Sequence, residues 1–153
     1  MELEEIFKNR TRINLYADDE ANHYSAGAIW NGDWRKGRLL RGWFGNDFKP
    51  RHYAVCMGRQ TRCYDYVNVL FFLPMTSMPH EFGCYLLKIA AGKVDFLPRD
   101  TYVLPICMLM KEESLEYWAE ANYQGELPNE LTAELKSAWA ARIRSFKMKE
   151  NRK

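Results

Sequence analysis

The sequence contains no long hydrophobic segment. Its longest apolar run, VNVLFFLPM at residues 67–75, is interrupted by Asn68 and Pro74. It is far shorter than the roughly 20 residues that a helix needs to cross a bilayer. The amino-terminal residues MELEEIFKNR are acidic and then mixed in charge, unlike a signal peptide. We therefore expect a cytoplasmic protein without a membrane partner.

The sequence also lacks the spacings that are typical of metal and cofactor sites. Its four cysteines form no C-x-x-C pair, and its three histidines are scattered along the chain. Buried, reduced thiols account for cysteines in such apolar contexts. The sequence contains neither a hydrolase elbow nor a phosphate-binding loop. We therefore expect no metal site and no cofactor.

Neither sign of charge dominates the chain. The 22 basic and 20 acidic residues leave a formal net charge of +2, so a basic surface has to arise from local clustering. Apolar residues make up 47% of the chain and charged residues 27%, which is typical of a folded domain with its own core. The length of 153 residues fits one such domain.

Short apolar segments separated by turns follow one another from residue 37 onward. They have no helices between them, a pattern that favours a small antiparallel barrel or sandwich over a parallel sheet. We therefore expect a mainly β fold. Pro105 indicates an edge or a bulge in the last strand. The expected strands lie at residues 37–44, 51–58, 65–73, 84–89 and 101–109.

The apolar period changes near the C-terminus. Residues at intervals of three and four predict an amphipathic helix over 130–147, with Asn129 as its N-cap after Pro128. This helix should pack on the barrel or on a partner. The apolar stripe consists of Leu131, Leu135, Ala138, Trp139, Ile143 and Phe146.

The same patterns divide the chain into three parts. Residues 1–34 form an extension that begins with the spacing of a short helix and continues as a polar, turn-rich segment over residues 17–34. Residues 35–147 form the barrel domain with its C-terminal helix. Residues 148–153 form a basic tail.

One short span concentrates positive charge and aromatic rings. Guanidinium groups beside rings that can stack suit single-stranded nucleic acid. A solvated basic face above core aromatics is the alternative. The basic members are Arg35, Lys36, Arg38, Arg41, Lys49 and Arg51, and the aromatic members are Trp34, Trp43, Phe44, Phe48 and Tyr53.

Two adjacent hydroxyls follow the most apolar strand. Thr76 and Ser77 lie between Pro74 and Pro79. Hydroxyls in such a place can cap backbone groups of a turn. The other interpretation is that Pro74 ends the ladder and the strand delivers a hydroxyl to a functional surface.

The order of these segments resembles that of the PemK/MazF family of toxin endoribonucleases. The opening strand of the family matches RKGRLLRGWF, and its next loop and strand match KPRHYAV. Its hydroxyl motif matches FLPMTS, and a later strand matches RDTYVLP. Its closing turn and helix match GELPNELTAELKSAW. The similarity covers about residues 36–146.

The resemblance implies a fold and a chemistry. The fold is a small SH3-like barrel of the PemK/CcdB type with a C-terminal helix. Arg51 and Thr76 take the positions of the residues that act on the scissile phosphate during metal-independent RNA cleavage, with Ser77 beside them. Because the pKa of arginine is too high for a base, the base must come from Asp47, His52 or His80.

The resemblance also implies partners. Single-stranded RNA would lie across the shared face of a homodimer, and a small antitoxin would block that groove. The alternative is a non-catalytic binding protein on the same fold that inhibits a protein or nucleic-acid target. The residues expected to bind the substrate are Arg38, Arg41, Trp43, Phe48, Lys49 and His80.

Overall fold

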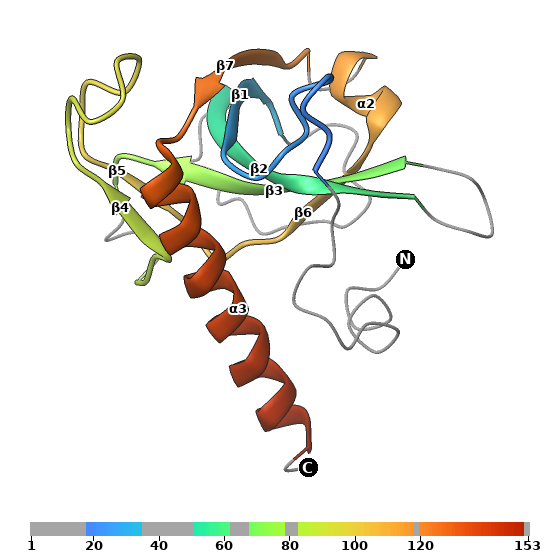
Figure 1. Cartoon of the computed structure of the whole chain (residues 1–153), viewed down its shortest axis with the longest axis vertical. Helices are drawn as coiled ribbons and strands as arrows, with labels where there is room; N and C mark the ends of the chain where they lie inside the picture. The colour runs from blue at the N-terminus through green and yellow to red at the C-terminus, as the bar shows by residue number, and fades with distance from the viewer. Residues whose placement is uncertain (1–17, 35–50, 62–67, 79–82, 118–119, 152–153) are drawn as a thin grey trace.

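The chain folds into a curled, mainly antiparallel β-sheet with a long helix at its C-terminal end (Figure 1). The structure is a computed structural model that describes residues 18–34, 51–61, 68–78, 83–117 and 120–151. Within these residues, seven strands form one half-barrel sheet. The fold is therefore mainly β with a C-terminal helix, as the sequence predicts.

The strands follow the order β4-β5-β3-β2-β1-β7 across the sheet, and β6 pairs with β3 outside this path. The elements in chain order are β1 (Ala28–Asp33), β2 (Arg51–Thr61), β3 (Asn68–Thr76), β4 (Leu87–Ile89), β5 (Thr101–Val103), β6 (Met108–Lys111), α2 (Glu112–Tyr117), β7 (Asn122–Glu126) and α3 (Asn129–Asn151).

Strand β3 lies at the centre of the sheet because both of its faces are apolar. Alternate residues of a strand face opposite sides of a sheet. Phe71 and Leu73 belong to one buried cluster, whereas Leu70 and Phe72 belong to another. The run that was too short to span a membrane is thus a strand between two cores.

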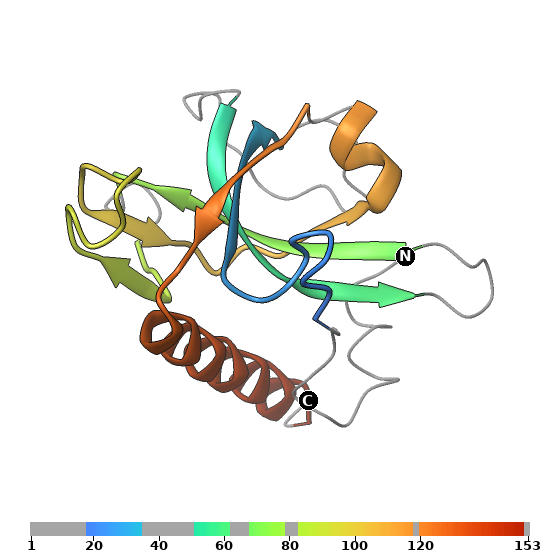
Figure 2. The same cartoon turned by 45° about the horizontal axis from the view of Figure 1, so that its top comes forward.

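Helix α3 covers the first of these cores. Leu135, Trp139 and Ile143 are buried in the cluster that contains Phe71 and Leu73, and the rings of Phe71 and Trp139 lie 5.0 Å apart. Figure 2 shows the helix running beneath the strands. The predicted helix and its packing on the sheet are confirmed, and the helix begins at Asn129. The prediction that Asn129 is the N-cap is wrong, because the first intrahelical hydrogen bond runs from Thr132 N to the carbonyl of Pro128 at 3.0 Å.

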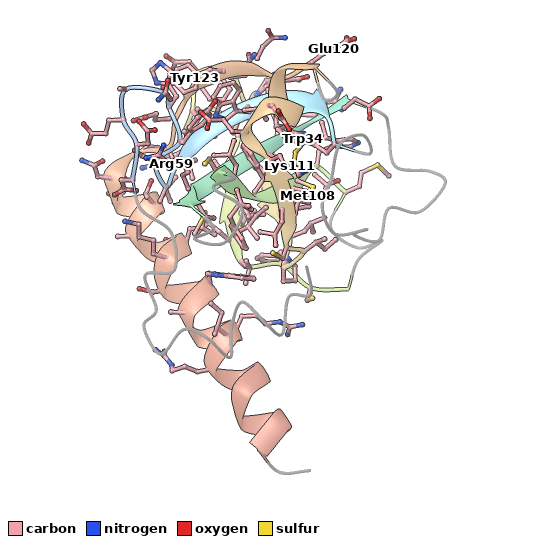
Figure 3. All side chains as sticks on the ribbon, turned by 90° about the vertical axis from the view of Figure 1, so that its right-hand side faces the viewer. Trp34, Arg59, Met108, Lys111, Glu120 and Tyr123 are labelled. Carbon is pink, nitrogen blue, oxygen red and sulfur yellow. The ribbon has the colours of Figure 1, made fainter. Side chains whose placement is uncertain are left out.

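The second core lies on the opposite face of the sheet. Trp34, immediately after β1, packs its ring 4.8 Å from that of Phe72 and is only 1% exposed. Leu115 of α2 and Met108 of β6 complete this cluster. Figure 3 labels Trp34 and Met108 within it. This core lies on the same face of β3 as Thr76, because Phe72 and Thr76 are four residues apart along the strand.

The expectation that Pro74 ends the strand is wrong, because β3 continues through it to Thr76. In an antiparallel ladder the N–H and C=O of one residue point to the same side. The carbonyl of Pro74 accepts a hydrogen bond from Leu104 N at 2.9 Å, so the missing N–H also lies on that side. The neighbouring strand is interrupted there by Pro105, which separates β5 from β6.

Other boundaries differ from those that the sequence indicates. The single strand expected over 101–109 is two strands, as the bulge expected at Pro105 allows. Strand β1 lies inside the polar stretch 17–34, between β2 and β7 in the sheet. Strand β7 and helix α2 had no clear sequence signal. The expected strand over 37–44 and the N-terminal helical spacing lie outside the described residues. None of the described helices is long and apolar enough to cross a membrane.

Candidate functional site

The start of β2 and the end of β3 meet at one rim of the sheet. In the β2–β3 ladder Ala54 pairs with Pro74, and the same antiparallel register carried two residues further places His52 opposite Thr76. The Nδ1 atom of His52 lies 3.4 Å from the carbonyl oxygen of Met75, which supports this register. Two segments that the sequence singled out independently are therefore neighbours in space.

Thr76 combines a structural contact with a remaining donor. Its side chain is largely buried, and its Oγ1 accepts a hydrogen bond from Met78 N at 3.1 Å. A hydroxyl carries one donor and two acceptor lone pairs, so this contact does not use its proton. Ser77, the next residue, is exposed. The turn interpretation is thus correct for Thr76, and it leaves the O–H able to donate.

His52 is held by its surroundings. Its carbonyl accepts a 2.6 Å hydrogen bond from the indole Nε1 of Trp34. Its Nδ1 lies near the Met75 carbonyl, and its Nε2 is buried. A ring in this position fixes the end of β3 against the start of β2. His52 therefore helps to hold Thr76 in position and does not present its ring to a ligand.

The rim continues from Thr76 onto β5 and β4. Tyr102 pairs with Thr76 on one side and with Lys88 on the other, so the three side chains share one face of the sheet. The rings of Tyr85 and Tyr102 meet edge-on, with their centres 5.0 Å apart. The side chain of Tyr85 is 50% exposed. The ammonium group of Lys88 lies 5.9 Å from the centre of the Tyr102 ring.

Lys88 forms an exposed ion pair with Asp100. Its Nζ lies 3.7 Å from Oδ2 of Asp100, and both side chains are about half exposed. The other oxygen of Asp100 accepts a hydrogen bond from Ala91 N at 2.8 Å. An exposed pair of this kind contributes little to stability. Lys88 can therefore exchange Asp100 for another anion at small cost.

Most other predicted site residues lie outside the described part of the chain, and the structure does not place them relative to Thr76. Arg51 is the first residue of β2, where its backbone pairs with Asp33, but its side chain is outside the description. The residues that are not described at all are Arg38, Arg41, Trp43, Asp47, Phe48, Lys49 and His80.

Tyr85, Lys88 and Tyr102 were missed at the sequence level. Alternation alone indicates that Lys88, between the buried Leu87 and Ile89, faces away from the core. No sequence signal, however, pairs β4 with β5 and β5 with the end of β3. The ladder register brings Tyr102 and Lys88 to the face of Thr76, and a ring contact places Tyr85 beside Tyr102.

A second aromatic cluster lies near the opposite edge of the sheet. His23 stacks on Tyr123 at 3.8 Å, and Trp30 donates its indole N–H to the His23 carbonyl at 3.0 Å. His23 has a φ of 60°, a left-handed conformation held by the turn from Glu20. The rings of Trp30 and Tyr123 pack against the second core, so they close it at this edge.

The described residues contain no group of three or more histidine, cysteine or acidic side chains that could hold a metal ion. Comparison with known proteins gives no further guide. No family model, no curated protein and no solved structure matches the chain. The rim itself is therefore the feature of the molecule that indicates a function.

Proposed function

We propose that the chain is a metal-independent endoribonuclease that cleaves single-stranded RNA, built on a PemK/MazF-like, SH3-like barrel. The observation that carries the proposal is the β2–β3 register, which brings the start of β2, Arg51-His52, to the same rim as Thr76. These are the segments that hold the phosphate-directed residues in the family that the sequence resembles. Ser77 lies next to them, exposed.

The chemistry needs no nucleophile from the protein. The 2′-hydroxyl of RNA attacks the adjacent phosphate, the bond to the 5′-oxygen of the next nucleotide breaks, and a 2′,3′-cyclic phosphate forms. The protein has to orient the sugar and to stabilise the charge that develops on the phosphate oxygens. Fixed donors at a rigid rim suit this task.

Each residue at the rim has a role in this mechanism. Thr76 donates its hydroxyl proton to one phosphate oxygen, and its contact with Met78 N fixes the direction of the oxygen. Arg51, the first residue of β2, offers a planar set of donors that reaches the other oxygens around the end of the strand, because alternation gives the face of Thr76 to His52. His52 holds the two segments together. The base that accepts the 2′-hydroxyl proton is Asp47 or His80, because the ring of His52 is used to hold the two segments.

The partners follow from the same proposal. Single-stranded RNA binds along the basic and aromatic span of residues 35–51, with Arg38, Arg41, Lys49, Trp43 and Phe48 as its contacts. A homodimer extends that groove over two chains, and an antitoxin segment occupies it in the inhibited state. His80 lies close in sequence to Thr76 and contacts the same substrate.

One observation favours a second function, a non-catalytic inhibitor that binds a protein. Met78 is 48% exposed and Tyr85 is 50% exposed, and they are the large hydrophobic side chains left open among the described residues. Met78 follows the end of β3 by two residues, and Tyr85 packs against Tyr102 of the neighbouring strand β5. Exposed apolar side chains of this kind are typical of protein interfaces.

The experiment that separates the two functions is incubation of the purified protein with a long RNA, with and without EDTA. The endoribonuclease cuts in both conditions and leaves 2′,3′-cyclic phosphate ends. Intact RNA at high protein concentration, together with a stable complex with a protein target, would favour the inhibitor. Cleavage that EDTA abolishes would contradict the proposed chemistry.

A further inference from the structure

Three residues form an open surface that we call the tyrosine platform: Lys88 and Tyr102 on the outer face of β4 and β5, and Tyr85 two residues before β4. The two rings meet edge-on at 5.0 Å, and Lys88 lies above the ring of Tyr102. Because Tyr102 is partly covered in this way, Tyr85 supplies the ring that is open to a ligand. Tyr102 and Lys88 support it from the side.

The platform adjoins the rim that carries Thr76. Thr76 and Tyr102 are directly paired, as are Tyr102 and Lys88. Neighbouring strands lie about 4.8 Å apart, so Tyr102 is one strand from Thr76 and Lys88 is two strands away. A chain bound at Thr76 that crosses the strands toward β4 therefore passes over the platform.

We propose that the tyrosine platform is a base-binding subsite for single-stranded RNA, next to the phosphate held at Thr76. A base stacks on the open ring of Tyr85, and the ammonium group of Lys88 contacts the phosphate that follows it. This inference rests on the proposed function for the direction of the RNA strand. It adds residues that the family resemblance did not indicate.

The chemistry of the platform favours nucleic acid over a protein segment. Stacking on an aromatic ring is available to every base, and cations beside the ring bind the backbone. A purely apolar protein contact would leave Lys88 without a role, whereas a phosphate can replace Asp100 as its partner at 3.7 Å. The subsite therefore binds several bases with little sequence preference.

Binding of a non-cleavable oligonucleotide tests the platform apart from catalysis. The probe is a 2′-O-methyl RNA of mixed sequence that carries a fluorescent base analogue, titrated at two salt concentrations. Tyr85→Leu should weaken binding about 5- to 150-fold with little change in the salt dependence, because one stack is lost. Lys88→Ala should flatten the log–log salt slope by about 0.7, the share of one phosphate contact.

Two controls accompany these variants. Tyr85→Phe keeps the ring and should bind like the wild type. Tyr123→Leu removes a ring from β7, at the other end of the strand order, and should leave the affinity unchanged. Tyr85 is half exposed, so its replacement should not disturb folding, and a thermal melt of each variant checks this.

The outcomes distinguish the platform from the enzyme. Tyr85-dependent binding without cleavage of ordinary RNA supports the platform and contradicts the proposed catalysis. Cleavage and binding that are unchanged in Tyr85→Leu overturn the platform and leave the enzyme. No binding of the probe by the wild type, even at low salt, overturns both. Loss of a protein partner with unchanged RNA affinity in Tyr85→Leu assigns the surface to protein instead.

Discussion

Thr76 shows at the scale of one residue how a structural contact and a chemical role can occupy the same side chain. Its oxygen accepts the Met78 N–H and thereby closes the turn after β3. The same contact fixes the oxygen in space, and a donor that is fixed in advance is more effective on a developing charge. The hydroxyl motif is therefore both a cap and a candidate site.

Replacement of Thr76 separates these two roles. Thr76→Val removes the hydroxyl, and we expect RNA cleavage to fall about 100- to 1,000-fold because one transition-state donor is lost. The lost acceptor for Met78 N should cost about 0.5–1.5 kcal/mol of stability, measured by urea unfolding. Thr76→Ser, the matched control, should keep most of the activity. Cleavage at the wild-type rate by both the valine and the serine variants would exclude the Thr76 hydroxyl from the chemistry.

Cys56 carries a prediction about pH. Burial in the second core raises the pKa of its thiol from 9.0 to about 12. Between pH 9 and pH 12 the thiol of the unfolded chain loses its proton, whereas the thiol of the folded protein keeps it. The contribution of the protonated thiol to the free energy of unfolding is therefore complete below pH 9 and is lost as the pH rises toward 12. The loss amounts to at most about 1.4 kcal/mol per pH unit.

Urea unfolding of the wild type and of Cys56→Ala at pH 8, 10 and 11 measures this effect. The alanine variant is less stable at pH 8 because it leaves a cavity in the core. We expect the gap in unfolding free energy to narrow at pH 10 and 11, because only the wild type loses the contribution of this thiol. A gap that stays constant with pH would show that the Cys56 thiol ionises normally.

At the scale of elements, the sequence predicts those helices and strands that bury an apolar face. It does not predict those that form because neighbouring strands pair with them. The stripe of α3 and the apolar run of β3 could be predicted because both face cores. Strand β1 could not, because Asn31-Gly32-Asp33 reads as a turn. It forms a strand because β2 and β7 pair with it on both sides, a tertiary effect without a local signal.

The contact of α3 with the sheet gives the prediction at this scale. Trp139 is 8% exposed and lies against Phe71, so Trp139→Ala should destabilise the protein by about 3–5 kcal/mol. Ala141 lies on the same helix and is exposed, so Ala141→Ser should change stability by no more than about 0.5 kcal/mol. Thermal or chemical unfolding compares the two. A small effect of Trp139→Ala would mean that the helix is not docked as described.

At the scale of the whole molecule, the candidate site is a product of register. The sequence could indicate Thr76 by its hydroxyl motif and Arg51 by its basic context. It could not show that Tyr102 and Lys88 continue the same face, since that depends on the pairing of β5 with the end of β3. Residues distant in the chain thus form one surface, with α3 on the opposite face of the sheet and extending toward the C-terminus (Figure 1).

The most direct test of the central claim is cleavage of two short oligonucleotides that span a cut site mapped on a long RNA. One is all ribose, and the other carries a single deoxyribose at the nucleotide whose 2′-hydroxyl would attack. In EDTA, the first should be cut to a 2′,3′-cyclic phosphate product and the second should remain intact. Equal cutting of both would show that the 2′-hydroxyl is not the nucleophile, and it would contradict this account.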